Sequence, residues 1–84
     1  MAPQETFHLR NLLSSYEREK ILIEQHFENR VQPIYRAIQG ARNADEVRNI
    51  GMQLSREIQE RDREIQRINQ KIEETKLEIN RNLL

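Results

Sequence analysis

The residues that could bind a metal ion in this chain are its two histidines and the carboxylates near them. His8 and His26 are 18 residues apart, and neither has a second histidine or a cysteine three or four residues away. That spacing is needed to place two metal ligands on one face of a helix. Glu24 and Glu28 flank His26 at two residues and therefore point to other helix faces. We expect no metal site and no cofactor.

Residues for nucleophilic or acid–base catalysis are equally sparse. Cysteine is absent, and Ser14, Ser15 and Ser55 have no nearby histidine with an orienting acid. Adjacent carboxylates such as Glu73 and Glu74 are common on solvated helix faces and imply no pocket. Both glycines are isolated, which excludes a phosphate-binding loop. We therefore expect no catalytic residues and no enzymatic activity.

The charge pattern does not favour nucleic-acid binding. The 84 residues include 14 basic and 14 acidic side chains, interleaved along the chain. Arg30, Arg36, Arg42 and Arg48 step by six residues, so on a helix they spiral and do not line one groove. No broad basic face is left to attract a phosphate backbone.

The composition indicates long helices with narrow buried stripes. Hydrophobic residues make up 36% and charged residues 33%, against roughly 45–50% and about 25% in ordinary domains. Only two Gly and two Pro are available for turns. No apolar run approaches the ~20 residues that span a bilayer, and the first residues do not resemble a secretion signal. We expect an all-α, soluble, cytoplasmic protein that could reach a membrane only through its partners.

A heptad row marks residues 44–82 as a coiled-coil helix. Its steps alternate between four and three residues, which keeps the row on one face only if the helix supercoils against another. The row consists of Val47, Gly51, Leu54, Ile58, Arg61, Ile65, Ile68, Ile72, Thr75, Ile79 and Asn82.

A second amphipathic helix is predicted over residues 5–39. Its apolar stripe, with the stem of Lys20 in one slot, consists of Leu9, Leu13, Tyr16, Ile23, Phe27, Val31, Ile34 and Ile38. Pro33 lies inside this stripe and removes a backbone donor, while apolar spacing continues beyond it. A kink near Pro33 is favoured over a true stop.

Residues 40–43 are predicted to form the corner between the helices. Gly40 suits the left-handed residue that often follows a helix. Asn43 suits an N-cap, with Glu46 positioned to return a hydrogen bond as in a capping box. A connection this short usually turns the chain back on itself. We predict one helical-hairpin domain over residues 1–84.

A hairpin of this size buries little on its own, because single cores at this length rarely supply more than ~3–5 kcal/mol. We predict self-association, as a coiled coil or antiparallel four-helix bundle, or docking on another helical protein. The predicted buried row is Leu54, Ile58, Ile65, Ile68, Ile72 and Ile79, and Val47 and Arg61 are further predicted interface residues of the same helix. The predicted second contact surface on the first helix is Phe27, Val31, Ile34, Tyr35 and Ile38.

Arg61 is the one charged residue in the heptad row. One interpretation is a buried ionic layer, in which the guanidinium meets polar side chains of other helices and fixes register. The other is an extended side chain that reaches solvent and pairs with Glu57 or Glu64 on its own helix.

The stretch from Val47 to Ile68 resembles a SNARE motif, most closely the second helix of the SNAP-25-type members, and the resemblance extends over residues 47–82. The shared features are Gly51, the Glu57-Ile58 pair, Arg61 at the ionic-layer position, and Ile65-x-Arg67-Ile68. The resemblance implies a parallel four-helix bundle that draws membranes together. This chain departs from the pattern, since that subgroup has Gln at the Arg61 position and acylated cysteines.

Three functions are therefore open. The first is a non-enzymatic adaptor module that assembles with itself or with a helical partner. The second is a small chaperone or escort subunit of a secretion or assembly system, and the third is a SNARE-like fusion helix.

Overall fold

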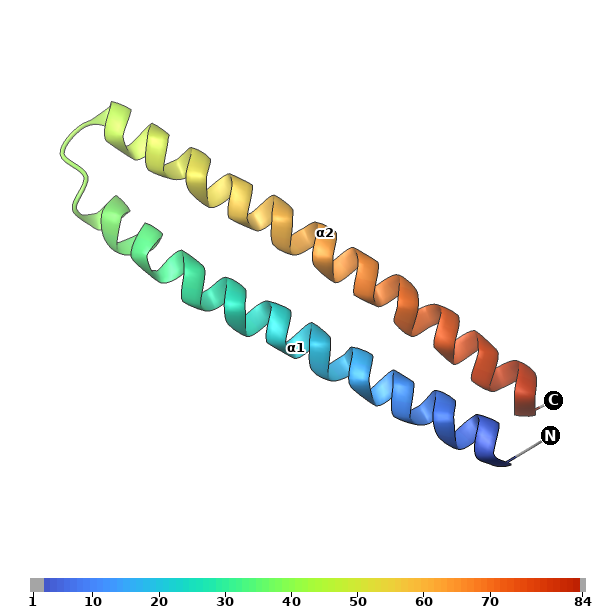
Figure 1. The fold of residues 1–84 in the computed structure, drawn as a ribbon. Coiled ribbons are helices and arrows are strands. Elements are labelled where there is room, and N and C mark those ends of the chain that lie inside the picture. The colour runs from blue at the N-terminus through green and yellow to red at the C-terminus, as the bar shows by residue number, and fades with distance from the viewer. Residues whose placement is uncertain (1–2, 84) are drawn as a thin grey trace.

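The computed structural model describes residues 3–83, which form two α-helices joined by a short turn (Figure 1). Helix α1 spans Pro3–Gln39 and helix α2 spans Ala44–Leu83. The two lie side by side and run in opposite directions, so that both ends of the chain are at the same end of the molecule. The described part of the chain has no strand. The prediction of an all-α helical hairpin is confirmed.

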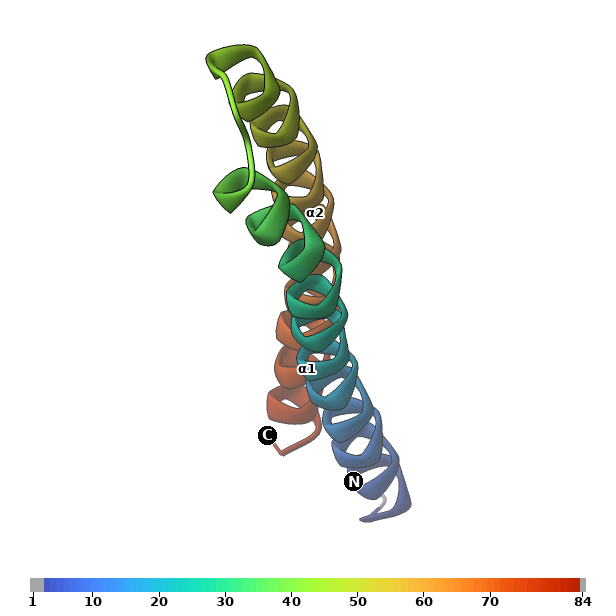
Figure 2. The ribbon, with the colours of Figure 1, turned by 90° about the vertical axis from the view of Figure 1, so that its left-hand side faces the viewer.

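Helix α1 continues through Pro33 without interruption. Because proline has no N–H, the carbonyl of Asn29 loses its helical donor at this point. Pro33 and Asn29 are both exposed, so water can satisfy that carbonyl. The end of α1 that follows curves away from the line of its first part (Figure 2).

The end of α1 differs from the left-handed conformation that was predicted for Gly40. The N–H of Gly40 donates to the carbonyl of Arg36 at 3.1 Å, and the N–H of Ala41 donates to that of Ile38 at 3.2 Å. No described residue has a positive φ, so the expected left-handed conformation of Gly40 is wrong. The last turn tightens to an i→i−3 bond, which satisfies a terminal carbonyl without a left-handed residue.

The start of α2 is capped by Asn43, as predicted. Its Oδ1 accepts from the N–H of Glu46 at 2.9 Å, and its carbonyl accepts from the N–H of Val47 at 3.2 Å. The carboxylate of Glu46 returns a bond, but to the N–H of Arg42 at 2.8 Å, one residue before the cap. These bonds fix the direction in which α2 leaves the turn.

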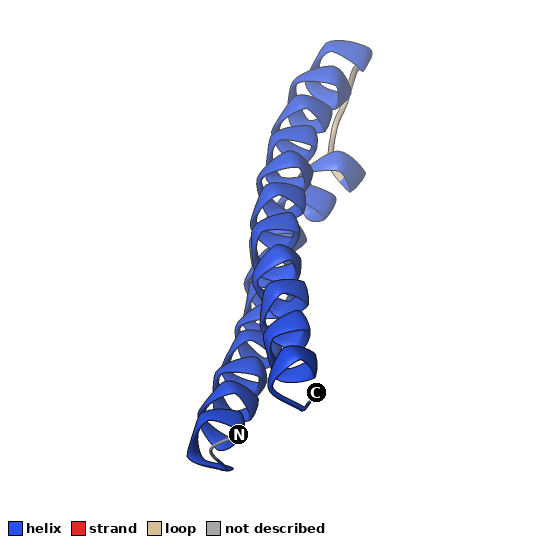
Figure 3. Ribbon diagram, turned by 90° about the vertical axis from the view of Figure 1, so that its right-hand side faces the viewer, coloured by secondary structure: helices blue, strands red, loops and turns tan. Residues whose placement is uncertain are grey.

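The core is a single thin seam between the helices, which cross at a shallow angle (Figure 3). Its buried apolar side chains are Leu9, Phe27, Val31, Ile68 and Ile72. Thr75 is also buried, and its hydroxyl donates to the carbonyl of Lys71 at 2.7 Å. This local bond satisfies the hydroxyl within α2.

The hairpin exposes more surface than a compact protein of its mass. Its accessible surface is 6696 Å², whereas a compact monomer of 10.2 kDa exposes about 5,300 Å². Its radius of gyration is 19.1 Å, against about 12 Å for a compact chain of this length. The molecule measures 64 × 16 × 10 Å, a rod about one helix thick. The hairpin therefore encloses no second layer of core.

Candidate interaction surfaces

The predicted row on α2 faces α1, but the seam does not close evenly along it. Ile68 and Ile72 are buried, at 3% and 7% exposed. Arg61 is only half-buried, as are four aliphatic members: Leu54, Ile58, Ile65 and Ile79. Val47, near the corner, is 46% exposed. The row is therefore covered in the second half of α2, and much of the rest keeps apolar surface in contact with solvent.

The predicted second surface on α1 is divided by the structure. Phe27 and Val31 are 5% and 1% exposed, so both belong to the seam inside the hairpin. Ile34 and Ile38 are half-buried, and only Tyr35 is largely exposed. The expectation of an outer surface anchored by Phe27 and Val31 is corrected accordingly, because α2 already covers them.

Arg61 occupies the seam by lying against an aromatic ring. Its Cζ is 4.3 Å from the centroid of the Phe27 ring. Its guanidinium also donates to the carboxylate of Asp62, at 2.9 and 3.1 Å. The side chain keeps 27% of its surface exposed. Within one hairpin, Arg61 thus forms no buried ionic layer, and its carboxylate partner is neither Glu57 nor Glu64.

Glu57 is held instead by Arg30, across the two helices. The Nε of Arg30 donates to Glu57 Oε2 at 2.8 Å, the one ion pair between α1 and α2 in the described residues. This hydrogen bond raises the pKa of Arg30. A base whose pKa is higher in the folded than in the unfolded chain stabilises the fold. This stabilisation is fully present at a pH below the unfolded pKa, and it is lost as the pH rises through the folded pKa. For arginine that window lies in strong alkali.

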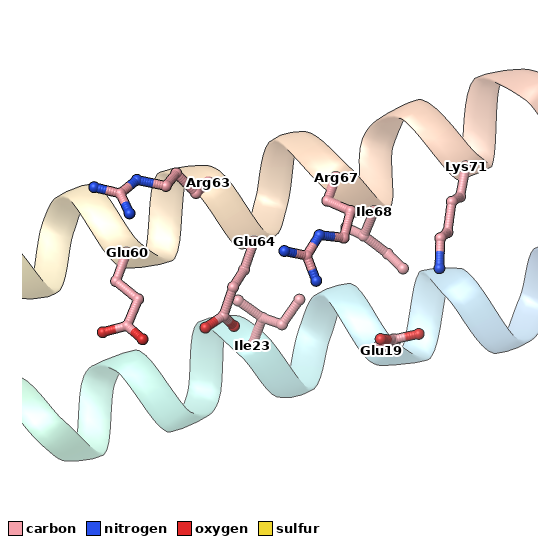
Figure 4. Close-up of a pocket in the computed structure, with 8 residues that line it drawn as sticks. All are labelled: Glu19, Ile23, Glu60, Arg63, Glu64, Arg67, Ile68 and Lys71. Carbon is pink, nitrogen blue, oxygen red and sulfur yellow. The ribbon is translucent and has the colours of Figure 1, made fainter.

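A charged groove lies along one side of the hairpin (Figure 4). It has a volume of about 370 Å³, and its lining residues are Glu19, Ile23, Glu60, Arg63, Glu64, Arg67, Ile68 and Lys71. Glu19 and Ile23 come from α1 and the others from α2. We call this the charged groove.

The charges of this groove are ordered along α2. Arg63 also lines the groove between the two glutamates, and Glu19 lines it from α1. Figure 4 shows Glu60 and Glu64 toward one end and Arg67 and Lys71 toward the other. None of these four has an ion pair within the described residues. The ammonium of Lys71 lies 5.7 Å from the centroid of the Tyr16 ring. Sequence analysis missed this groove, although the spacing of the four charges could have revealed it.

Other large apolar side chains are exposed away from the seam. The most exposed are Phe7, Ile21, Leu77 and Leu83, at 68, 57, 56 and 56%. Over the described residues, neither helix has a stretch long and apolar enough to cross a bilayer. Residues 3–83 also contain no cluster of three or more potential metal ligands.

Comparisons with known proteins add no family to this description. No family model matches the chain, and neither the curated proteins nor the solved structures give a significant match. The SNARE-motif resemblance of residues 47–82 therefore stays a prediction.

Proposed function

We propose that this protein is a non-enzymatic interaction module, which acts by packing its helical hairpin against further helices. The observation that carries the proposal is the surface of 6696 Å², about 1,400 Å² more than a compact monomer of the same mass exposes. Burial of apolar surface is the main source of folding free energy, at roughly 25 cal/mol per Å². A rod with one thin seam buries little apolar surface, so it gains little folding free energy from burial.

The half-buried isoleucines support the same proposal. Ile58, Ile65 and Ile79 belong to the heptad row yet stay partly exposed after α1 has packed. In coiled coils and bundles such positions are covered on both sides, because each knob fits a hole made by neighbouring helices. A further helix is the element that would cover them. The partner is a second copy of this chain or another helical protein.

The two other functions remain hypotheses with their own tests. An escort role predicts that the chain purifies with one partner and behaves poorly alone. A SNARE-like role predicts parallel partner helices and a large loss of assembly when Arg61 is replaced.

Thermal melting at several concentrations tests the proposal. Assembly stabilises the folded state by mass action, so the Tm of the helical signal should rise from about 1 µM to about 100 µM protein. A chain that is fully helical and melts at the same Tm at every concentration would overturn the proposal. Melting in the presence of a helical partner from its own cells extends the test to hetero-assembly.

A further inference from the structure

We propose that the charged groove is the docking site for a second copy of this chain, with the two α2 helices antiparallel. The inference rests on the proposed function, because it names the partner of the interaction module. It starts from four side chains of the groove: Glu60, Glu64, Arg67 and Lys71.

The spacing of these charges places them on one face of α2. They are separated by four, three and four residues, the same alternation as in the heptad row. All four line the same groove, which shows that they share a side of the hairpin. Among these four the acidic pair precedes the basic pair, and the midpoint lies between Ile65 and Gln66. Arg63 also lines the groove, but it lies between the two glutamates and outside this pattern.

A two-fold axis through that midpoint matches each of these four charges with its opposite. Glu64 and Arg67 are equally far from the axis, as are Glu60 and Lys71. In a two-fold interface, residue i meets residue j and j meets i. Glu60 would therefore face Lys71 of the second copy, Glu64 would face its Arg67, and each pair would occur twice.

This symmetry is the reason to name a second copy as the partner. A partner helix must present basic side chains to the acidic pair and acidic side chains to the basic pair. A second copy of α2 that runs antiparallel presents the charges in that order, so no unrelated sequence is needed. A parallel, in-register pair would place Glu60 against Glu60 and Lys71 against Lys71, which like charges disfavour. The charges thus select the antiparallel orientation of the same sequence.

The groove offers a small apolar contact beneath the charges. Ile23 of α1 is half-buried and keeps apolar surface open to a partner, whereas Ile68 of α2 is 3% exposed and is already covered inside the hairpin. Exposed ion pairs contribute little affinity and mainly set orientation and register. A standard interface needs about 800 Å² from each partner, which is less than the surface that the hairpin exposes beyond a compact monomer. The elongated shape therefore has enough free surface for such a dimer.

Charge reversal tests the inference on the full chain. The first variant is Glu60→Lys with Glu64→Lys, and the second is Arg67→Glu with Lys71→Glu. Each turns every proposed pair into a like-charge contact, so each should raise the Kd of the dimer about 30-fold or more. An equimolar mixture of the two variants should associate as a heterodimer, because their grooves are then complementary. Combining all four changes in one chain should restore the homodimer.

Two controls separate the charge pattern from other effects. Glu17→Lys with Glu24→Lys makes the same change in net charge on α1, at exposed residues that do not line the groove, and should leave the Kd unchanged. Circular dichroism checks that each variant is helical. If the lysine pair unfolds, Glu60→Gln with Glu64→Gln replaces it, and should weaken the dimer and reduce its sensitivity to salt.

Sedimentation velocity then distinguishes the outcomes. Loss of the dimer in each double variant, with recovery in the mixture and in the fourfold variant, would support the inference. A wild-type assembly that none of the reversals weakens, or a mixture that does not associate, would overturn it and leave the proposed function standing. A fully helical wild-type monomer would overturn both.

Discussion

The guanidinium of Arg61 on α2 stacks over the ring of Phe27 on α1, with Cζ 4.3 Å from the ring centroid. Phe27 is 5% exposed, and the arginine covers one face of its ring. The planar cation interacts with the π-face of the ring while its edge donates to Asp62. A charge thus lies in the middle of the seam without being buried or unpaired.

Replacing Arg61 by alanine should lower the free energy of unfolding by about 1 kcal/mol, the usual range of a partly exposed cation–π contact. Urea denaturation at fixed protein concentration measures this change. Arg56→Ala, at an exposed position on the same helix, is the control and should have little effect. Arg61→Ala abolishing assembly would instead indicate an ionic layer with partner helices.

The two phenylalanines offer a matched comparison of buried and exposed positions. Phe27→Ala should cost about 3 kcal/mol, because it removes the largest side chain of the seam. Phe7 is 68% exposed, so Phe7→Ala should change the stability by less than about 0.5 kcal/mol. The measurement is chemical denaturation followed by circular dichroism. Equal effects of the two substitutions would contradict the packing described for Phe27.

The cap of α2 should be measurable as well. Asn43→Ala removes the acceptor of the Glu46 N–H and should cost about 1 kcal/mol, whereas Asn43→Asp should retain most of the capping. Asn49→Ala, at an exposed position inside α2, is the control. Thermal melts in which all three variants match the wild type would show that Asn43 does not cap α2.

The two glycines should both tolerate alanine. A Cβ at Gly51 would meet no atom within 4 Å, so Gly51→Ala should stabilise α2 by about 1 kcal/mol through helix propensity. A Cβ at Gly40 would lie 3.7 Å from the carbonyl oxygen of Arg36, an ordinary contact. Since Gly40 has no positive φ, Gly40→Ala should be neutral or mildly stabilising. Destabilisation by Gly40→Ala of more than about 1 kcal/mol would indicate a left-handed residue after all.

Local sequence patterns predicted the helices and the cap because these features depend on neighbours in the chain. The heptad row identified the face of α2 that meets α1, and Asn43 marked the cap. The conformation of Gly40 was not predictable in the same way. A helix can end by a left-handed residue or by a tightened turn, and the direction of the following chain decides between them.

The contacts between the helices could not be read from the sequence. Arg61 had Glu57 and Glu64 within reach on its own helix, but Arg30 from α1 binds Glu57. That choice depends on a residue far away in the chain. Likewise, the width of the stripe on α1 did not show that Phe27 and Val31 lie inside the hairpin. A stripe defines a face, whereas the depth of burial depends on the side chains opposite.

The central claim is that this hairpin is incomplete alone and assembles through its free helical surface. Sedimentation equilibrium of the full wild-type chain at micromolar concentration tests it most directly. We expect a mass that approaches twice 10.2 kDa, increasing with protein concentration. A single species of 10.2 kDa that is fully helical and stable at every concentration would contradict the claim.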